Sequence, residues 1–353
     1  MNADVKINIA GADAGKGINP ALAERYAGKT ACVIGAGFGG MALAIRLQSA
    51  GIATTVIESR DKPGGRAYFW ERDGFTFDGG PTVITDPPCL EELWQLTGHD
   101  IAEDVELMKV MPFYRLNWPD GTNFEYSNDE EQLNAEIAKL NPADVAGYAR
   151  FLEYSARVYE EGYLKLGTKP FLDFKSMLKA APALIKEQAW RSVYSMVSSY
   201  IEHPKLREAF SFHSLLVGGN PMNTSSIYAL IHKLEKDGGV WWARGGTNRL
   251  IAGMVRHFER LGGTMRVGDP VLQVHTIGTK ATEVETKSGF RQRFDAVASN
   301  ADIMQATSNS AGHLPARQSR AIRRCKRISA MTLFLRDTQH RTACSWVILQ
   351  LLL

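Results

Sequence analysis

Three glycines near the start of the chain have the spacing of a phosphate-binding turn. Gly35, Gly37 and Gly40 lie between a short apolar run and an amphipathic one. The first glycine of such a turn lets a strand bend sharply, the second lets the backbone approach a pyrophosphate, and the third lets helix and strand pack closely. The phosphates then meet free N–H groups at the positive end of a helix. This spacing predicts a dinucleotide-binding site.

An acidic residue follows at the distance where such sites bind a ribose. Glu58 lies 21 residues after Gly37, and its carboxylate can accept hydrogen bonds from both ribose hydroxyls. An acid here argues against NADP, but it does not separate NAD from FAD. The sequence KPGGR then supplies Gly65, for a second close backbone approach, and Arg66, a fork of donors for phosphate or flavin. Taken alone, KPGGR fits an ordinary turn with a solvated arginine equally well.

The elements around these residues form the unit that the motif requires. We predict a buried strand over residues 29–34, a helix over 39–50 closed by Gly51 just past its end, and a second strand, rich in β-branched side chains, over 52–58. The pattern indicates an α/β fold with a Rossmann-like nucleotide-binding domain built on a parallel sheet. Residues 128–235 are mostly helical in pattern, and the chain then returns to α/β. The domain is therefore predicted to be interrupted by a largely helical insertion.

Composition limits the class of protein. The chain has 353 residues, 44% of them hydrophobic, and a net charge of +3, which gives no reason to expect a nucleic-acid partner. Four scattered cysteines indicate neither a disulfide framework nor a metal site, and a reducing cytoplasm is the natural setting. Residues 1–28 lack a secretory signal, and no run reaches the roughly 18 apolar residues of a membrane span. We expect a protein that is soluble or bound to a membrane surface.

Several longer segments resemble a known family. VIGAGFGGMALAIRLQSAG, ESRDKPGGRAY and GFTFDGGPTVIT are similar to the flavin-dependent desaturases and amine oxidases. EGYLKLGTKPFLDF, AFSFHSLLVGGNPMNTSSIYALIH, GVWWARGGTNRLIAGM and AVASNAD narrow the resemblance to the bacterial-type phytoene desaturases, of the FAD-dependent carotenoid/retinoid oxidoreductase family. The resemblance covers roughly residues 29–305 nearly without gaps.

The resemblance implies a set of residues that hold FAD. Near the isoalloxazine it places Gly80, Pro81 and Thr82, with a turn at Gly245 and Gly246 beside the ring. The backbone of Val271 matches the position that meets the adenine. The remaining cofactor-binding residues that it implies are Gly35, Ala36, Gly37, Phe38, Gly40, Glu58, Gly65 and Arg66.

The resemblance also implies a reaction, the FAD-dependent desaturation of 15-cis-phytoene toward lycopene in carotenoid biosynthesis. Its partners would be phytoene and other acyclic carotenoids, with quinone or oxygen as electron acceptor. A hydrocarbon offers no group to polarise, so the flavin would carry the hydride chemistry and the protein would supply an apolar tunnel. For the proton that must also leave, the candidate groups are Asp173, Lys175, Lys179, His213 and Glu235. A surface charge or, for His213, a core position is the better interpretation of each, so the catalytic acid and base stay unassigned.

Because the implied substrate dissolves in lipid, a membrane-facing surface is expected. Residues 174–196, predicted as helix interrupted at Pro182, mix cations with large apolar side chains, as an interfacial helix does. A helix that faces the protein's own core is only slightly less expected. The implied location is cytoplasmic, peripheral on the inner face of the cell membrane. The side chains concerned are Lys175, Lys179, Lys186, Arg191, Leu178, Leu184, Ile185, Trp190 and Val193.

Five regions are predicted along the chain. They are a flexible N-terminal extension (1–28), a first part of the FAD-binding domain with the start of a substrate-domain sheet (29–127), a helical substrate- and membrane-facing region (128–238), a second part of the FAD-binding domain (239–327) and a divergent C-terminal tail (328–353).

The C-terminal end departs from the resemblance. Members of the family continue for well over a hundred further residues, and nothing after Asp302 matches them. We therefore expect a truncated or frameshifted chain that retains FAD weakly and turns over little. The alternatives are a non-catalytic fragment of such an enzyme, or another flavin oxidoreductase such as a carotenoid ketolase or amine oxidase. Among the alternative functions, an NAD-dependent dehydrogenase is the least expected.

Overall fold

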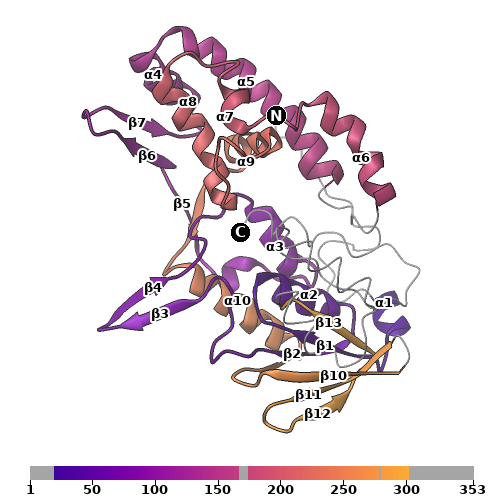
Figure 1. Cartoon of the computed structure of the whole chain (residues 1–353). Coiled ribbons are helices and arrows are strands. Elements are labelled where there is room, and N and C mark those ends of the chain that lie inside the picture. The colour runs from indigo at the N-terminus through magenta and orange to yellow at the C-terminus, as the bar shows by residue number, and fades with distance from the viewer. Residues whose placement is uncertain (1–19, 167–173, 278–279, 302–353) are drawn as a thin grey trace. The chain divides into compact units, whose positions relative to one another are not determined.

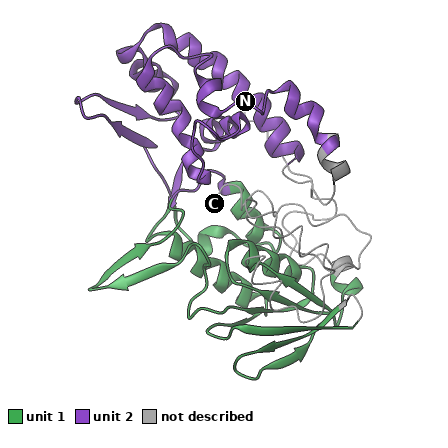
Figure 2. Cartoon of the chain, viewed as in Figure 1, with its two compact units in different colours: residues 1–82, 88–107, 243–339 green, residues 83–87, 108–242, 340–353 purple. Residues whose placement is uncertain are grey.

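The computed structural model describes residues 20–166, 174–277 and 280–301, and these form two compact units (Figures 1 and 2). Among the described residues, unit 1 comprises 20–82, 88–107 and 243–301, and unit 2 comprises 83–87 and 108–242. The finer regional boundaries given above stay predictions, and the tail 328–353 lies outside the described residues.

Unit 1 is built on a parallel four-stranded sheet in the order β13-β1-β2-β9. The middle residues of β1 are fully buried, because one face of the sheet meets helices and the other meets a second sheet. The α/β fold class with a parallel sheet is thus confirmed. The strands are β1 (Thr30–Ile34), β2 (Ala53–Ile57), β9 (Thr264–Arg266) and β13 (Ala296–Ser299), and the crossover helix is α2 (Phe38–Ser49).

Helices and a second sheet cover the parallel sheet of unit 1. Helix α10 (Thr247–Arg260) lies beside α2, and the antiparallel sheet β10-β11-β12 packs its apolar residues against the opposite face (Figure 1). A separate hairpin, β3-β4, follows the KPGGR turn. Their bounds, with those of the shorter elements, are α1 (Pro20–Arg25), β3 (Phe69–Arg72), β4 (Phe75–Asp78), α3 (Pro87–Gln95), η1 (Ile101–Glu103), β10 (Val271–Ile277), β11 (Lys280–Thr286) and β12 (Arg291–Arg293).

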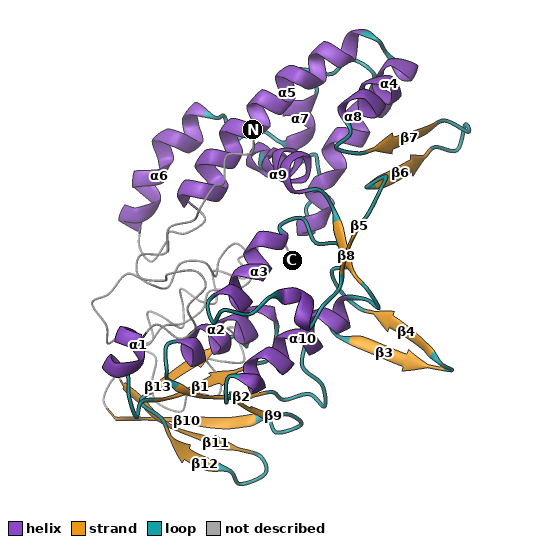
Figure 3. Cartoon of the chain, turned by 180° about the vertical axis from the view of Figure 1, so that it is seen from behind, coloured by secondary structure: helices purple, strands orange, loops and turns teal. Residues whose placement is uncertain are grey.

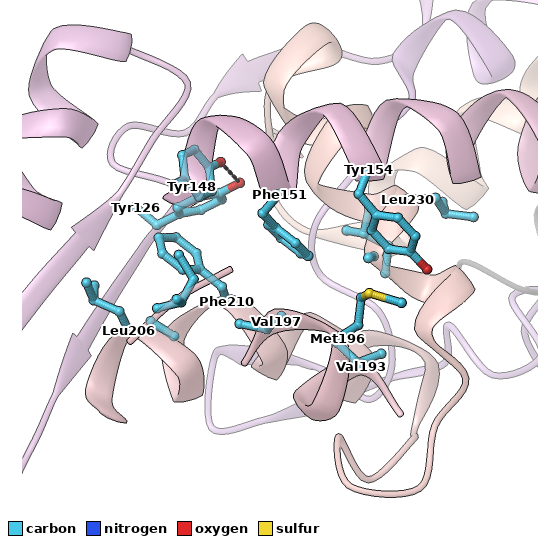
Figure 4. Packing of buried hydrophobic residues seen from close by; sticks show 14 of the residues in the cluster. Tyr126, Tyr148, Phe151, Tyr154, Val193, Met196, Val197, Leu206, Phe210 and Leu230 are labelled. Carbon is cyan, nitrogen blue, oxygen red and sulfur yellow. Dashed lines mark hydrogen bonds between the residues drawn. The ribbon is translucent and has the colours of Figure 1, made fainter. Parts of the chain in front are cut away.

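Unit 2 is mostly helical, with two small pairs of strands (Figure 3). Its longest helix, α5, places an aromatic residue on the core side at nearly every turn. These side chains pack with α7, α8 and α9 (Figure 4). The elements are β5 (Leu107–Lys109), β6 (Tyr114–Asn117), β7 (Asn123–Tyr126), α4 (Glu130–Leu140), α5 (Ala143–Tyr159), η2 (Glu160–Leu166), α6 (Phe174–Lys186), α7 (Val193–Val197), α8 (Pro204–Ser211), η3 (Phe212–Val217), η4 (Ser226–Ala229), α9 (Leu230–Gly238) and β8 (Trp241–Ala243).

One local prediction in unit 2 is corrected. Helix α6 runs through Pro182, which was expected to interrupt it. A proline inside a helix removes one backbone hydrogen bond and its ring crowds the carbonyl four residues earlier, yet helical backbone continues on both sides of Pro182. The helix that begins at Ala143 is followed at Glu160 by a seven-residue π-helix, in which the turns are wider than in an α-helix.

Candidate functional site

The turn between β1 and α2 has the geometry that its glycines predict. Gly35 has a φ of 98°, which favours glycine, and its N–H donates to the Ile57 carbonyl at 2.8 Å. A Cβ on Gly40 would lie 1.9 Å from the carbonyl oxygen of Gly35, so only glycine fits there. Helix α2 starts at Phe38, and its N-cap, Gly37, supplies no side-chain hydrogen bond. The positive end of the helix is therefore left for a ligand.

The KPGGR turn packs directly on this first turn. The Gly64 N–H donates to the Ala36 carbonyl at 2.9 Å, and a Cβ on Gly65 would lie 3.0 Å from the Cα of Gly37. Gly65 has a φ of 59°. The Arg66 side chain is exposed. The structure thus brings Gly65 next to the glycine turn and leaves Arg66 exposed.

Glu58 is buried against the same turn. Its Oε2 accepts from the Ala36 N–H at 2.7 Å, and its Oε1 accepts from the Ser59 hydroxyl at 3.1 Å and the Arg60 N–H at 2.9 Å. Only 5% of the residue is exposed. A carboxylate has about four acceptor positions, so one remains beside Ala36 after these three bonds. Binding to a ribose stays a prediction.

Val271 lies on the Glu58 side of the site. The residue is buried, and it shares an apolar cluster with Cys32 and Ile57. Just before it, the Asp269 N–H donates to the Glu58 carbonyl at 3.1 Å. The start of β10 is therefore held next to the end of β2, although more than two hundred residues separate them in the chain.

Asp78 joins two further glycine segments, and sequence reasoning missed it. Its carboxylate accepts from the Thr247 N–H at 2.8 Å and from the side-chain amide of Asn248 at 3.1 Å, at the start of α10. A Cβ on Gly246 would lie 2.2 Å from its Oδ2. The Thr247 hydroxyl also donates to the Pro81 carbonyl.

These bonds place the segment Gly80–Thr82 beside the turn Gly245–Gly246. A Cβ on Gly80 would in turn lie 2.2 Å from the Arg66 carbonyl, so this segment also touches the KPGGR turn. Glycines from three distant parts of the chain thus meet within unit 1. Pro81 is half-buried and Thr82 is exposed.

Asn300 is a second residue that sequence reasoning missed. It follows β13, and its N–H donates to the Ile34 carbonyl at 2.8 Å. Its amide nitrogen would be 3.1 Å from a Cβ on Gly37. Its Oδ1 is buried without a hydrogen-bond partner. The sequence could have pointed to Asn300 through its position just after a predicted strand, because ligands of parallel sheets bind beyond the carboxyl ends of the strands.

Two of the proposed proton acceptors lie together in the core of unit 2. His213 Nε2 is 3.0 Å from Glu235 Oε2, and the Tyr114 hydroxyl donates to Glu235 Oε1 at 2.7 Å. Both residues are completely buried, which fits the core interpretation of His213. Its Nδ1 is buried without a partner. Asp173 lies outside the described residues, as do the side chains of Lys175 and Lys179.

Burial also determines the protonation state of the neighbouring His232. Its Nε2 donates to the Phe210 carbonyl at 2.8 Å, so its Nδ1 accepts from the Tyr126 hydroxyl at 3.0 Å. Desolvation holds the pKa of His232 well below its ordinary value, so the ring is neutral. These polar atoms satisfy one another and are not open to a substrate.

In the part of the chain that the structure describes, no cluster of three or more His, Cys, Asp or Glu could hold a metal ion. Across the same residues, no helix is both long and apolar enough to cross a membrane.

Comparison with known proteins decides the family. The sequence signature of the flavin containing amine oxidoreductases matches residues 38–340, most of the chain. The chain belongs to this family. The expected likeness to flavin-dependent desaturases and amine oxidases is thereby confirmed, and a flavin is the cofactor class that the family uses.

Curated bacterial relatives share a large part of the sequence. The chain is 58% identical over 313 residues to the phytoene desaturase (lycopene-forming) of Paracoccus sp. (strain N81106 / MBIC 01143), covering 89% of the chain and 62% of the relative. It is 57% identical over 288 residues to the enzyme of the same name from Pantoea ananas, covering 82% and 58%. The chain thus spans about six tenths of the length of these relatives.

Solved structures of two oxidoreductases share the fold. An oxidoreductase from Methanosarcina mazei has a TM-score of 0.55 at 18% identity, covering 84% of this chain and 64% of that one. An A394C mutant of putrescine oxidase has a TM-score of 0.54 at 19% identity, covering 83% and 62%. At these identities the likeness concerns the fold alone.

Proposed function

We propose that this chain catalyses, or is the larger part of an enzyme that catalyses, the FAD-dependent desaturation of phytoene toward lycopene. The observation that carries the proposal is the convergence of three glycine segments and Glu58 in unit 1, in a chain 58% identical to a lycopene-forming desaturase. A 4,4'-diapolycopene oxygenase of Methylomonas sp is only 31% identical, which favours desaturation over oxygenation.

The residues present fit a flavin dinucleotide. The uncapped start of α2, at Ala36, Gly37 and Phe38, would receive the pyrophosphate. Glu58 would accept from a ribose, and the backbone of Val271 would meet the adenine. The unpartnered Oδ1 of Asn300, beside Gly37, supports a polar ligand in this turn. The remaining residues that would hold FAD are Gly35, Gly40, Gly65 and Arg66 at the turns, and Gly80, Pro81, Thr82, Gly245 and Gly246 near the isoalloxazine.

The chemistry divides between cofactor and protein. When bound, FAD supplies the oxidation by accepting a hydride from the hydrocarbon, and a quinone or oxygen would later take the electrons. The polyene has no polar group to bind, so the chain must orient it by apolar contacts and exclude water. A proton must also leave the neighbouring carbon, and a side chain of the protein must accept it.

A membrane surface is the proposed source of the substrate. Leu178 and Ile185 on α6, and Trp190 just beyond it, are 56%, 61% and 68% exposed. Lys186, between them, is exposed as well. Such a mixture suits a helix that lies in a lipid interface. Val193 is buried and Leu184 half-buried, so these two do not contribute. We propose a peripheral position on the inner face of the cell membrane.

Pigment formation tests the function. The chain, and a version extended with the C-terminal part of the Paracoccus relative, would be expressed in cells that accumulate phytoene. We expect lycopene in the cells that express the extended version. Lycopene in the cells that express the 353-residue chain would show that this chain alone catalyses the reaction. Oxygenated carotenoids would instead indicate a ketolase. Phytoene left unchanged by both proteins, each with flavin bound, would contradict the proposal.

A further inference from the structure

Asn300 lies against all three glycines of the first turn. A Cβ on Gly35 would be 3.4 Å from the carbonyl carbon of Asn300, and a Cβ on Gly40 would be 3.4 Å from the Asn300 Cβ. A Cβ on Gly37 would be 3.1 Å from the Asn300 amide nitrogen. These residues all belong to unit 1. The Asn300 side chain therefore lies at the start of α2, where the pyrophosphate is proposed to bind.

Two backbone contacts hold Asn300 in this position. Its N–H donates to the Ile34 carbonyl at 2.8 Å, which extends the pairing of β13 with β1 beyond Ser299. The N–H of the next residue, Ala301, donates to the Ser299 hydroxyl at 3.3 Å. The parallel sheet thus fixes the place of the Asn300 side chain, at the carboxyl end of β13.

The Asn300 side chain has an unused hydrogen-bond acceptor. Its Oδ1 is buried, and no described residue donates to it. A buried acceptor without a donor destabilises the protein, so a ligand that donates a hydrogen bond to this oxygen would bind more tightly. A pyrophosphate cannot be that donor, because its oxygens accept hydrogen bonds. The partner must be a hydroxyl or N–H group close to the pyrophosphate.

The order of the strands indicates which half of the dinucleotide carries this donor. In the order β13-β1-β2-β9, Glu58 follows β2 on one side of β1, and Asn300 follows β13 on the other side. Glu58 is proposed to bind the ribose of the adenosine half. With its pyrophosphate at Gly37, the dinucleotide would extend its flavin half toward β13. The donors of that half nearest to the pyrophosphate are the hydroxyl groups of the ribityl chain.

We propose that Asn300 binds the flavin half of the cofactor, through a hydrogen bond that a ribityl hydroxyl donates to its Oδ1. The inference rests on the proposed function, but only on its cofactor. Asn300 then distinguishes FAD from ADP, because ADP has no ribityl chain. Glu58 does not distinguish them, because both ligands contain the adenosine.

Equilibrium titration of the apoprotein, followed by calorimetry, tests this inference without turnover. The ligands are FAD, ADP and an FAD analogue with a pentamethylene chain in place of the hydroxylated ribityl carbons. Asn300→Leu keeps the shape of the side chain and removes both polar atoms. We expect this variant to bind FAD about tenfold more weakly, the effect of one hydrogen bond, and ADP as tightly as wild type. Its preference for FAD over the analogue should fall by the same factor.

Glu58→Gln is the matched control on the other side of β1. This variant should weaken FAD and ADP binding by equal factors and keep the wild-type preference for FAD over the analogue. Asn300→Ala, a smaller side chain, decides the matter if Asn300→Leu does not fold. If an Asn300 variant loses as much affinity for ADP as for FAD, or keeps the full preference for FAD over the analogue, the inference alone is overturned. A wild-type protein that binds no FAD overturns the proposed function with it.

Discussion

The glycine turns of unit 1 and the tyrosine–histidine core of unit 2 achieve close packing in opposite ways. In unit 1, backbone segments touch because side chains are missing, and a Cβ on Gly40 would lie 1.9 Å from a carbonyl oxygen. In unit 2, aromatic rings fill the space, and the Tyr126 hydroxyl bonds Tyr148 (Figure 4). The same hydroxyl also bonds His232. The first arrangement leaves backbone N–H groups for a ligand, whereas the second uses most of its polar atoms internally. Substitutions in the two regions should therefore affect different measurements.

The largest effect is expected at Gly40. In Gly40→Ala the new methyl group meets backbone that cannot move aside, so we expect a loss of more than about 3 kcal/mol in the free energy of unfolding, together with loss of flavin. Urea unfolding and the flavin absorbance of the purified protein measure both. Gly121→Ala is the control, because Gly121 has a φ of 85° but open space around it. Equal losses in the two variants would show that the close approach to the Gly35 carbonyl does not determine the cost at Gly40.

Glu235→Gln should destabilise the core of unit 2 without changing the flavin content of the protein. An amide has one oxygen, so either the Tyr114 hydroxyl or the His213 N–H loses its acceptor in a completely buried site. We expect about 3 kcal/mol of destabilisation in urea unfolding. Glu130→Gln, which changes an exposed carboxylate on α4, should cost less than about 0.5 kcal/mol. A variant at 235 as stable as wild type would argue that this cluster is not a structural network.

Two buried histidines, His257 in unit 1 and His232 in unit 2, should make the free energy of unfolding fall in acid, each over its own pH range. Burial lowers the pKa of His257, in unit 1, to about 4, so the folded state binds fewer protons than the unfolded state below about pH 6.5. Stability is therefore full above pH 6.5 and falls until about pH 4, with about 2 kcal/mol lost by pH 5. In unit 2, His232 acts with the same sign and continues to lower pH. Urea unfolding of His257→Gln should lose less stability between pH 7 and pH 5 than wild type, and an identical loss would refute this assignment.

Asp78→Asn should have the smallest effect on stability but a specific effect on the site. The variant weakens the bonds to the first N–H groups of α10, at a cost of about 1 kcal/mol. Because Asp78 also holds Gly246 beside Pro81, flavin affinity should fall severalfold in a titration by fluorescence quenching. Asp129→Asn changes an equivalent cap on α4 in unit 2 and should leave flavin affinity unchanged. The same affinity in all three proteins would mean that Asp78 only caps its helix.

The parts of the site that could be predicted from sequence are local. The turn from Gly35 to Gly40 and the acid at 58 depend on spacing within one βαβ unit, which the chain fixes within about 30 residues. Asp78 and Asn300 escaped because their partners are 170 and more than 250 residues away, so only tertiary structure brings them together. The π-helix at Glu160 and the continuous helix through Pro182 escaped for another reason. In both segments the sequence pattern fits more than one helical conformation, and tertiary packing determines which one forms.

The central claim is that unit 1 holds a flavin dinucleotide through both of its halves. The most direct measurement is an equilibrium titration of the purified apoprotein with FAD and, separately, with FMN, followed by flavin fluorescence. Since Glu58 and Val271 are proposed to meet the adenosine half, we predict that FAD binds at one per chain and that FMN binds at least about a hundredfold more weakly, about 3 kcal/mol. Equal affinities for FAD and FMN, or no binding of FAD, would contradict the account.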